Sequence, residues 1–488
     1  MNGMQGGVMK VLVTGATGYI GGRIIPRLLV DGHSVRILTR DRARALARPW
    51  GDKVEIFVGD VLQPETLDEA LEGVDAAYYL VHSMYGGGDF AVKDRQAAEN
   101  FVAAGQRLRQ VIYLGGIVPG NEEERAASNH LESRAEVGRI LRAGLPTTEF
   151  RAGPIIGSGS ASFEMVRYLT ERLPAMIAPR WILNEVQPIS VRDVLDYLVA
   201  ALGRDDAFGI IDIGSHAVTF REMMTLYAKV RGLPRVILPV PVLAPKLAAL
   251  WVGLVTPIPN SLAVPLVEGV VQPVLGDTSR AGALFPEIEP RSYEEAVERA
   301  LFRIEDGDVA TRWTLSGEHD GVRLVDSEGI VREVRSRWVN ADTASTFRAF
   351  SSLGGERGWR VWNWAWKVRG FIDQLIGGPG LRVGRRDPEH VYPGEAIDFW
   401  RVEEVRRPNL LRLRAEMKVP GTAWLQFEAL AEKDGTRLIQ TAFFAPTGFW
   451  GWAYWYGIYP FHALIFNDMV EAVASDAERY AHVPIVVS

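Results

Sequence analysis

The chain of 488 residues contains no cysteine. This absence excludes disulfides, thiolate metal sites and a cysteine nucleophile, and it fits a protein of the reducing cytoplasm. The opening residues MNGMQGGVMK lack the apolar core of a signal peptide. The sequence therefore predicts a cytoplasmic protein.

Two further features are missing: a strong excess of one charge and a spaced set of metal ligands. Lys and Arg number 54 against 60 Asp and Glu, a net charge of −6, which favours no nucleic-acid partner. The eight histidines form no H-x-x-x-H pair, and no G-x-S-x-G or Walker sequence occurs. We predict no metal site and neither hydrolase nor kinase chemistry.

Long unbroken apolar runs are also absent. The stretch from Pro239 to Leu275 is nearly uncharged, but six further prolines interrupt it. The stretch from Ala442 to Phe466 carries no Asp, Glu, Lys or Arg, and prolines and glycines divide it. Such breakers disfavour continuous membrane-spanning helices. We interpret both stretches as pocket-lining or interfacial, which leaves peripheral membrane contact open.

What is present begins with KVLVTGATGYIGG at residues 10–22. The run Val11–Val13 predicts a buried strand, and an apolar helical pattern follows the glycines. A strand, a glycine turn and a helix in this order indicate a dinucleotide site, because the pyrophosphate can approach the N–H groups at the helix N-terminus. We expect the phosphate cradle to consist of Gly15, Thr17, Gly18, Tyr19, Ile20 and Gly21.

The first 200 residues alternate apolar strands with helices, which predicts an α/β fold of the Rossmann type with a doubly wound parallel sheet. The pattern loosens after Gly153, where we expect a small substrate lobe, mainly at 154–186 and 214–305. This domain should span residues 9–305. Its expected strands after the first are Ser34–Leu38, Val54–Val58, Ala76–Val81, Gln110–Leu114, Thr147–Arg151 and Gly209–Ile213.

The composition changes near residue 306, after which 11 of the 14 tryptophans occur. A helix is expected from about Tyr459 to Tyr480. The strands expected before it are Val331–Val339, Leu381–Val383, Glu395–Glu404, Leu410–Lys418, Thr422–Glu432 and Thr436–Ala445. We predict a second, Trp-rich α+β domain at 311–488, with an antiparallel sheet and a long C-terminal helix. Such an architecture commonly encloses a ligand. Its aromatic clusters indicate either a packed core or a cavity for a hydrophobic molecule, isoprenoid or quinone-like.

Several motifs resemble those of the extended and atypical short-chain dehydrogenase/reductase proteins, especially the NmrA-like branch. They are the glycine turn, Arg40, Gly59-Asp60-Val61, Val81-His82-Ser83 and Arg151-Ala152-Gly153-Pro154. The resemblance implies an NAD(P)-binding protein in which Asp60 accepts from the adenine amino group. It also implies cofactor contacts at Val61, Val81, His82, Gly153 and Pro154. The C-terminal part resembles an uncharacterised Trp-rich domain fused to such reductases, and its element order is similar to the START-like helix-grip fold.

The end of the second strand decides the choice of cofactor. NAD-binding proteins place a carboxylate there for the ribose hydroxyls, whereas an Arg favours a 2′-phosphate. This chain has Thr39 and Arg40 at that position, which favours NADP(H) and leaves NAD(H) as the alternative. Asp60 has an alternative role as well, because it could form an Asx turn before Pro64 instead of contacting the adenine.

The catalytic residues of the family are missing from their places. The resemblance implies a Tyr-x-x-x-Lys pair on one helix and a Ser before it, but Gly stands where the Ser is expected and the helix has no such pair. His130 and Arg134 share one helical face, so Arg134 could hold the ribose and His130 could donate a proton. An exposed helix pair is the alternative. Tyr85 is a second candidate donor.

Two hypotheses follow from this departure. In the first, the chain is an NADPH-dependent oxidoreductase with a substituted acid, acting on a hydrophobic carbonyl, enone or quinone-like substrate. In the second, it is a sensor or scaffold that binds NADP(H) without turnover and holds a hydrophobic ligand in the C-terminal domain. The sequence leaves the oligomeric state undecided.

Overall fold

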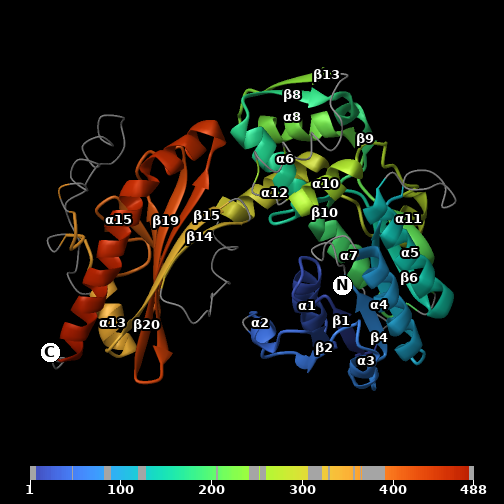
Figure 1. Ribbon diagram of the computed structural model, residues 1–488, viewed down its shortest axis with the longest axis horizontal. Coiled ribbons are helices and arrows are strands. Elements are labelled where there is room, and N and C mark those ends of the chain that lie inside the picture. The colour runs from blue at the N-terminus through green and yellow to red at the C-terminus, as the bar shows by residue number, and fades with distance from the viewer. Residues whose placement is uncertain are drawn as a thin grey trace. The chain divides into compact units, whose positions relative to one another are not determined.

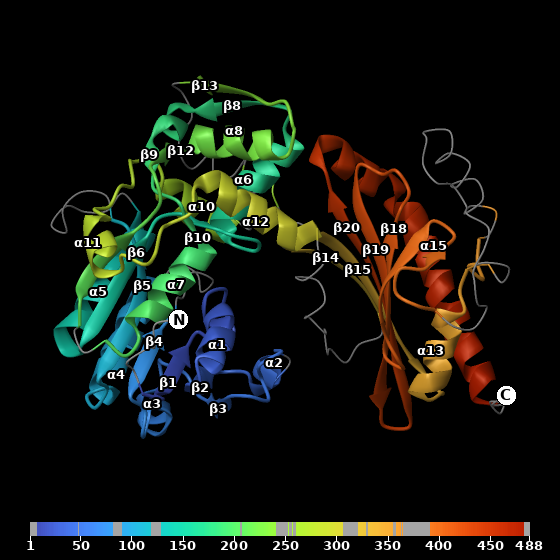
Figure 2. The same ribbon diagram turned by 180° about the vertical axis from the view of Figure 1, so that it is seen from behind.

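The structure, a computed structural model, has two compact units, Met1–Ser316 and Gly317–Ser488, and each unit has its own sheet. Figures 1 and 2 show the elements of each unit from opposite sides. The residues that the structure describes are 7–46, 48–81, 90–118, 128–204, 207–240, 252, 256, 260–305, 321–327, 330–354, 358–362, 364 and 391–482.

The first unit is built on a seven-stranded parallel sheet with the order β11-β6-β5-β4-β1-β2-β3. The strand order reverses between β1 and β4, and ligands of open α/β sheets bind outside the carboxyl ends of the strands at such a point. The predicted Rossmann-type sheet is confirmed. Its strands are β1 (Lys10–Thr14), β2 (Ser34–Thr39), β3 (Glu55–Val58), β4 (Ala76–Tyr79), β5 (Gln110–Gly116), β6 (Thr147–Ala152) and β11 (Gly209–Ile213).

Helices cover both faces of this sheet, because its strands are apolar on both sides (Figure 1). Val11 and Val13 belong to one buried core, while Leu12 between them belongs to the other. The first core includes α1 (Gly21–Val30), α7 (Val191–Ala201) and α11 (Ser279–Leu284). The second includes α3 (Pro64–Leu71), α4 (Phe90–Ala104) and α5 (Asn129–Gly144), and the short α2 (Arg42–Leu46) follows β2.

A smaller lobe continues from the carboxyl ends of β6 and β11 (Figure 2). Because the carboxyl ends of parallel strands lie at one edge, the lobe begins at the same edge as the glycine turn that follows β1. Its helices are α6 (Ala161–Arg172), α8 (Phe220–Val230), α10 (Asn260–Glu268), α12 (Tyr293–Glu305) and the 3-10 helix η1 (Arg180–Leu183). Its strands pair as β7 (Ile155–Ile156) with β10 (Ile189–Ser190), β9 (Glu185–Val186) with β12 (Val218–Thr219), and β8 (Ala175–Pro179) with β13 (Val236–Val240).

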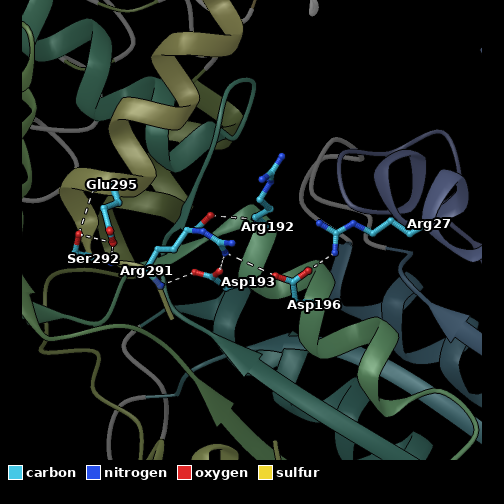
Figure 3. A network of polar contacts seen from close by, with 8 residues as sticks. Arg27, Arg192, Asp193, Asp196, Arg291, Ser292 and Glu295 are labelled. Carbon is cyan, nitrogen blue, oxygen red and sulfur yellow. Dashed lines mark hydrogen bonds and ion pairs between the residues drawn. The ribbon is translucent and has the colours of Figure 1, made fainter. Parts of the chain in front are cut away.

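A polar network ties α1 and α7 to the residues before α12 (Figure 3). Asp193 is fully buried in the first turn of α7 and accepts hydrogen bonds from the backbone N–H of Arg291, at 2.9 Å, and from the Arg291 guanidinium. Asp196, one turn later, pairs with Arg27 of α1 and lies 3.7 Å from Arg291 Nη1. The first turn of α7 therefore also anchors the end of the lobe.

The second unit contains a seven-stranded antiparallel sheet with the order β14-β15-β20-β19-β18-β17-β16. Two helices, α13 (Thr343–Ser351) and α15 (Gly448–Ala481), pack on one face, where Phe350, Phe427 and Met469 share a buried core. The predicted antiparallel sheet and long C-terminal helix are confirmed. The strands are β14 (Gly321–Ser327), β15 (Ile330–Val339), β16 (Ala396–Ile397), β17 (Trp400–Arg406), β18 (Leu410–Ala415), β19 (Gly421–Glu432) and β20 (Gly435–Pro446).

The last helix corrects one boundary. The sequence predicts its start near Tyr459, because glycine and proline precede that residue, but α15 begins at Gly448 and contains Pro460. Gly451 lies inside the helix, where its backbone packs closely against Pro420. A Cβ on Gly451 would lie 2.4 Å from the Pro420 carbonyl oxygen, so this glycine is required by a tertiary contact and does not mark a helix end.

Two other expectations in the second unit differ from the structure or fall outside it. The strand predicted from Glu395 to Glu404 divides into β16 and β17, because Asp398 adopts a left-handed φ of 55° between them. A strand expected at Leu381–Val383 lies outside the described residues. No helix in the part of the chain that the structure describes has the length and apolarity to cross a bilayer.

Candidate functional site

The glycine turn after β1 has the geometry of a phosphate cradle. Gly15 has a φ of 69°, and a Cβ on it would lie 2.3 Å from the Leu80 carbonyl oxygen. A Cβ on Gly21 would likewise lie 2.3 Å from the Gly15 oxygen, so both positions require glycine. At Gly18 a Cβ would meet only the Gly15 oxygen within 4 Å. No side chain caps α1, so its N-terminus fits an anionic group such as a pyrophosphate.

Residues outside the glycine motif donate hydrogen bonds to carbonyls of this turn, and these contacts were not predicted from the sequence. Arg48 Nη2 donates to the Thr17 carbonyl at 2.7 Å, and Trp50 Nε1 donates to the Gly22 carbonyl at 3.1 Å. Tyr19 packs under the Arg23 guanidinium, which lies 4.0 Å above its ring. The sequence offered one signal for these contacts, namely that a basic residue and an aromatic residue, Arg48 and Trp50, follow the second strand.

The end of β2 brings Arg40 close to Asp60. Arg40 Nη1 lies 3.8 Å from Asp60 Oδ2, and 81% of the Arg40 side chain is exposed. The other carboxylate oxygen of Asp60 accepts from the Leu62 N–H at 3.1 Å, which is the Asx turn that the sequence left open. Thr39 Oγ1 accepts from the Asp41 N–H at 3.3 Å. Arg40 therefore keeps an exposed guanidinium at the edge where a 2′-phosphate would lie.

Arg134, a catalytic candidate on α5, contacts the neighbouring strand β5. Its guanidinium donates to the carbonyl of Leu114, near the carboxyl end of β5. Tyr113 Oη donates to the Arg134 carbonyl at 3.0 Å, and burial raises the pKa of Tyr113 above its usual 10. His130 is half-buried one turn earlier on α5. His82 and Tyr85 lie outside the described residues.

The remaining cofactor candidates stand at the same edge of the sheet. Val81 lies two residues beyond the end of β4, and its backbone nitrogen would lie 3.2 Å from a Cβ on Gly15. The carbonyl of Val61 accepts from the buried Asn100 Nδ2 at 3.1 Å. Gly153 packs so closely that a Cβ would lie 2.0 Å from the Gln187 carbonyl oxygen, and the Pro154 carbonyl accepts from the Ile189 N–H at 3.0 Å.

A buried charge cluster surrounds Glu149 of β6, and it was not predicted from the sequence. Glu149 is 1% exposed on β6, and it accepts from Arg142 Nε at 2.7 Å and from Arg151 Nε at 2.8 Å. A Cβ on Gly138 of α5 would lie 2.4 Å from Glu149 Oε2, so that glycine makes room for the carboxylate. The pairing joins α5 and β6, and its three charged residues lie within ten positions of one another in the sequence.

The lobe encloses an apolar pocket of about 600 Å³. Every residue that lines it is apolar, and the lining comes from α6, β8, η1, α8 and α10 together with Val252 and Val270. The lining includes Met165, Leu169, Met176, Trp181, Phe220 and Met224. Such a pocket has the volume of a typical small-molecule site. Among the described residues no group of three His, Cys, Asp or Glu could hold a metal ion.

Comparisons with known proteins agree with this geometry. Residues 15–143 match the family model described as NAD(P)H-binding. A ceramide reductase of Caulobacter vibrioides is 30% identical over 240 residues, which are 46% of this chain and 72% of the relative. This chain belongs to the short-chain dehydrogenase/reductase family. The sterol demethylase protein B of Methylococcus capsulatus is 38% identical over 240 residues, 46% of this chain and 68% of the relative.

Other similarities are shorter or more distant. This dehydrogenase/reductase chain spans about half or less of the length of several other curated relatives that it matches. Among solved structures, a nucleoside-diphosphate-sugar epimerase of Staphylococcus aureus is 16% identical with a TM-score of 0.48, covering 59% of this chain and 100% of the epimerase. Residues 331–469 match a model described as a protein of unknown function (DUF2867).

Proposed function

We propose that the protein is an NADPH-dependent oxidoreductase that reduces a hydrophobic carbonyl, enone or quinone-like substrate. The observation that carries this proposal is the apolar pocket of about 600 Å³ in the lobe. The lobe continues from the strand ends at the edge where the dinucleotide cradle lies, so a substrate in the lobe and a nicotinamide on the sheet would approach from one side.

The names of the two relatives described above support a lipid-like substrate. One is a ceramide reductase and the other a sterol demethylase protein, and both names refer to large apolar molecules. A pocket lined by apolar side chains stabilises such molecules mainly by removing apolar surface from water. We therefore favour a sterol-like or long-chain ketone over a small polar one.

For cofactor choice we favour NADP(H) over NAD(H), on the exposed guanidinium of Arg40. The bound nicotinamide would supply a hydride to the substrate carbon, and an acid of the protein must then protonate the oxygen. We assign that proton to His130 or Tyr85. Arg134 stays charged and would orient the ribose from α5, where its guanidinium reaches the end of β5.

Exposed hydrophobic side chains beside the pocket support contact with a membrane surface. Ile177, Val236 and Leu238 are 62%, 55% and 57% exposed on the ribbon formed by β8 and β13, and the β8 strand, Ile177 included, lines the pocket. Exposed apolar residues of this kind dock proteins at bilayer surfaces. We place the protein in the cytoplasm, with this ribbon as its peripheral contact with the membrane.

A non-catalytic role as an NADP(H) sensor is the second candidate. It is favoured by the contact of the Arg134 guanidinium with the Leu114 carbonyl, because the family resemblance implies a Lys on this helix and an Arg cannot share the proton chemistry of a Lys.

The test is NADPH oxidation, followed at 340 nm, against a panel of hydrophobic ketones, enones and quinones. Met224→Trp fills the pocket and should raise KM about tenfold or more, while the affinity for NADP⁺ stays unchanged. Met224→Leu conserves volume and serves as the matched control. Absence of turnover by the wild type, despite micromolar cofactor binding, would establish the sensor instead.

A further inference from the structure

Three buried polar side chains of the second unit lie together beneath α15. Glu333 and Arg335 are two residues apart on β15, so both point to the same face of the sheet. Gln440 of β20 stands directly opposite Arg335 in the strand pairing. The three residues are 0%, 3% and 1% exposed. Arg335 Nη2 donates to the Ala463 carbonyl at 2.9 Å, so α15 covers the face that they share.

The hydrogen bonding of these side chains is incomplete. Both polar atoms of the Gln440 amide lack a hydrogen-bond partner among the described residues. Glu333 Oε1 forms an ion pair with Arg335 Nη2 at 2.5 Å, while Glu333 Oε2 and Arg335 Nε have no hydrogen-bond partner among the described residues. Native proteins pair nearly all of their buried polar groups, so several unpaired ones in one place indicate a missing partner.

The helix contributes a fourth unpaired group. Trp455 is 2% exposed, and its Nε1–H has no acceptor among the described residues. Its ring stacks on Phe444, with 5.4 Å between the ring centroids. Phe444 and Gln440 lie on the same face of β20 with Ala442 between them, and Ala442 stands opposite Glu333. A small side chain therefore sits at the centre of a ring of unpaired polar groups and aromatic surface.

We call Glu333, Arg335, Gln440 and Trp455 the polar cluster. We propose that the polar cluster binds the hydroxyl end of an apolar molecule between the sheet and α15. The hydroxyl would donate to the Glu333 carboxylate or the Gln440 oxygen and accept from the Trp455 N–H. Its carbon skeleton would contact the rings of Phe444 and Trp455.

The charges and the surroundings select this class of ligand. Glu333 and Arg335 neutralise each other, so the site offers no net charge for an ionic head group. The unpaired atoms include both donors and acceptors, which a hydroxyl can satisfy together. This site lies wholly within the second unit and does not depend on the oxidoreductase proposed for the first.

The experiment measures binding of two matched probes, cyclohexanol and cyclohexane, to the full-length protein by saturation-transfer NMR. The two probes share the same ring and differ in the hydroxyl. Gln440→Leu should weaken cyclohexanol binding at least about fivefold and leave cyclohexane binding unchanged. Trp455→Phe keeps the stacking ring but removes the donor, and it should also weaken cyclohexanol binding.

Gln426→Leu is the matched control. Gln426 is 3% exposed on the neighbouring strand β19, but it lies on the opposite face and is fully paired, accepting from Arg412 Nε at 2.9 Å and donating to Glu428 at 2.6 Å. This control should leave cyclohexanol binding unchanged. It should lower Tm, because it removes a hydrogen-bond partner of both Arg412 and Glu428. Gln440→Leu should raise Tm, because it removes an unpaired amide.

Three results would overturn the proposal. Equal binding of cyclohexanol and cyclohexane would show that the hydroxyl is not recognised. Undiminished cyclohexanol binding by Gln440→Leu and Trp455→Phe would place the bound probe elsewhere, for example in the pocket of the first unit. Absence of cyclohexanol binding to the wild type would leave ordered water as the partner of these groups.

Discussion

Arg40 is the residue on which the proposed preference for NADP(H) rests, because of its surroundings. Its side chain is 81% exposed, and its only ion pair in the described part of the chain is the 3.8 Å approach to Asp60. An ion pair at that distance and exposure is weak and screened by salt. A phosphate brought to this edge by a bound dinucleotide would compete for the guanidinium and form shorter, charge-assisted hydrogen bonds.

Arg40→Ala should therefore raise the Kd of NADPH about tenfold, because a hydrogen bond to a charged group contributes about 1.5 kcal/mol. The Kd of NADH should stay within about twofold, since it has no 2′-phosphate. Isothermal titration calorimetry with both cofactors measures the ratio. Arg42→Ala is the matched control, because Arg42 Nη1 already donates to the Ile56 carbonyl at 3.3 Å. An equal loss for NADPH and NADH would remove Arg40 from the recognition of the phosphate.

At the scale of elements, α7 connects the dinucleotide half of the sheet to the lobe. Its N-cap Ser190 accepts from the Arg192 N–H, so the start of the helix is fixed locally. Asp193 then points to Arg291, while Asp196 faces Arg27 and Arg291, as Figure 3 shows. One helix thus holds α1, which carries the cradle, and the segment that returns to α12.

Asp193→Ala should lower the free energy of unfolding of the first unit by about 2 kcal/mol, because it leaves the Arg291 N–H and guanidinium without their buried acceptor. Asp196→Ala should cost less than about 1 kcal/mol, since its side chain is 36% exposed. Urea unfolding of both variants, followed by circular dichroism, gives the comparison. Equal losses would mean that burial of Asp193 does not set the strength of this network.

The same elements show how far the sequence could predict the fold and site. The strand at Val11–Val13 and the glycine turn were predictable, because continuous apolar runs and glycine spacing are local signals. The start of α15 was not, since the contact of Gly451 with Pro420 joins residues far apart in the chain. The pairing of Glu149 with Arg142 and Arg151 was not predicted although the three residues are close in sequence, because charged residues of opposite sign near one another do not show by themselves that they are buried. The roles of the candidate site residues stay predictions.

At the scale of the whole molecule, the chain carries two sheets with separate cores, one parallel and one antiparallel. The cofactor candidates all belong to the first unit, Met1–Ser316, and the polar cluster belongs to the second, Gly317–Ser488. Tryptophan is unevenly divided as well, because four of the 14 fall in the first unit and ten in the second. Tryptophan fluorescence therefore reports mainly on the second unit.

This division predicts the response to cofactor. A ligand that binds only the folded first unit stabilises that unit by about 2.7 kcal/mol at a concentration of 100 Kd. Saturating NADP⁺ should thus raise the Tm of one calorimetric transition by about 4–8 °C. The transition followed by tryptophan fluorescence, excited at 295 nm, should shift by less than about 1 °C.

Gly15→Ala supplies the control, because a Cβ at that position would meet the Leu80 carbonyl oxygen at 2.3 Å and distort the cradle. With that variant NADP⁺ should shift neither transition. Equal shifts of both transitions in the wild type would contradict the prediction and show that the two units unfold as one. In that case a ligand of either unit would stabilise the other, and occupancy of the polar cluster would change the apparent affinity for the cofactor.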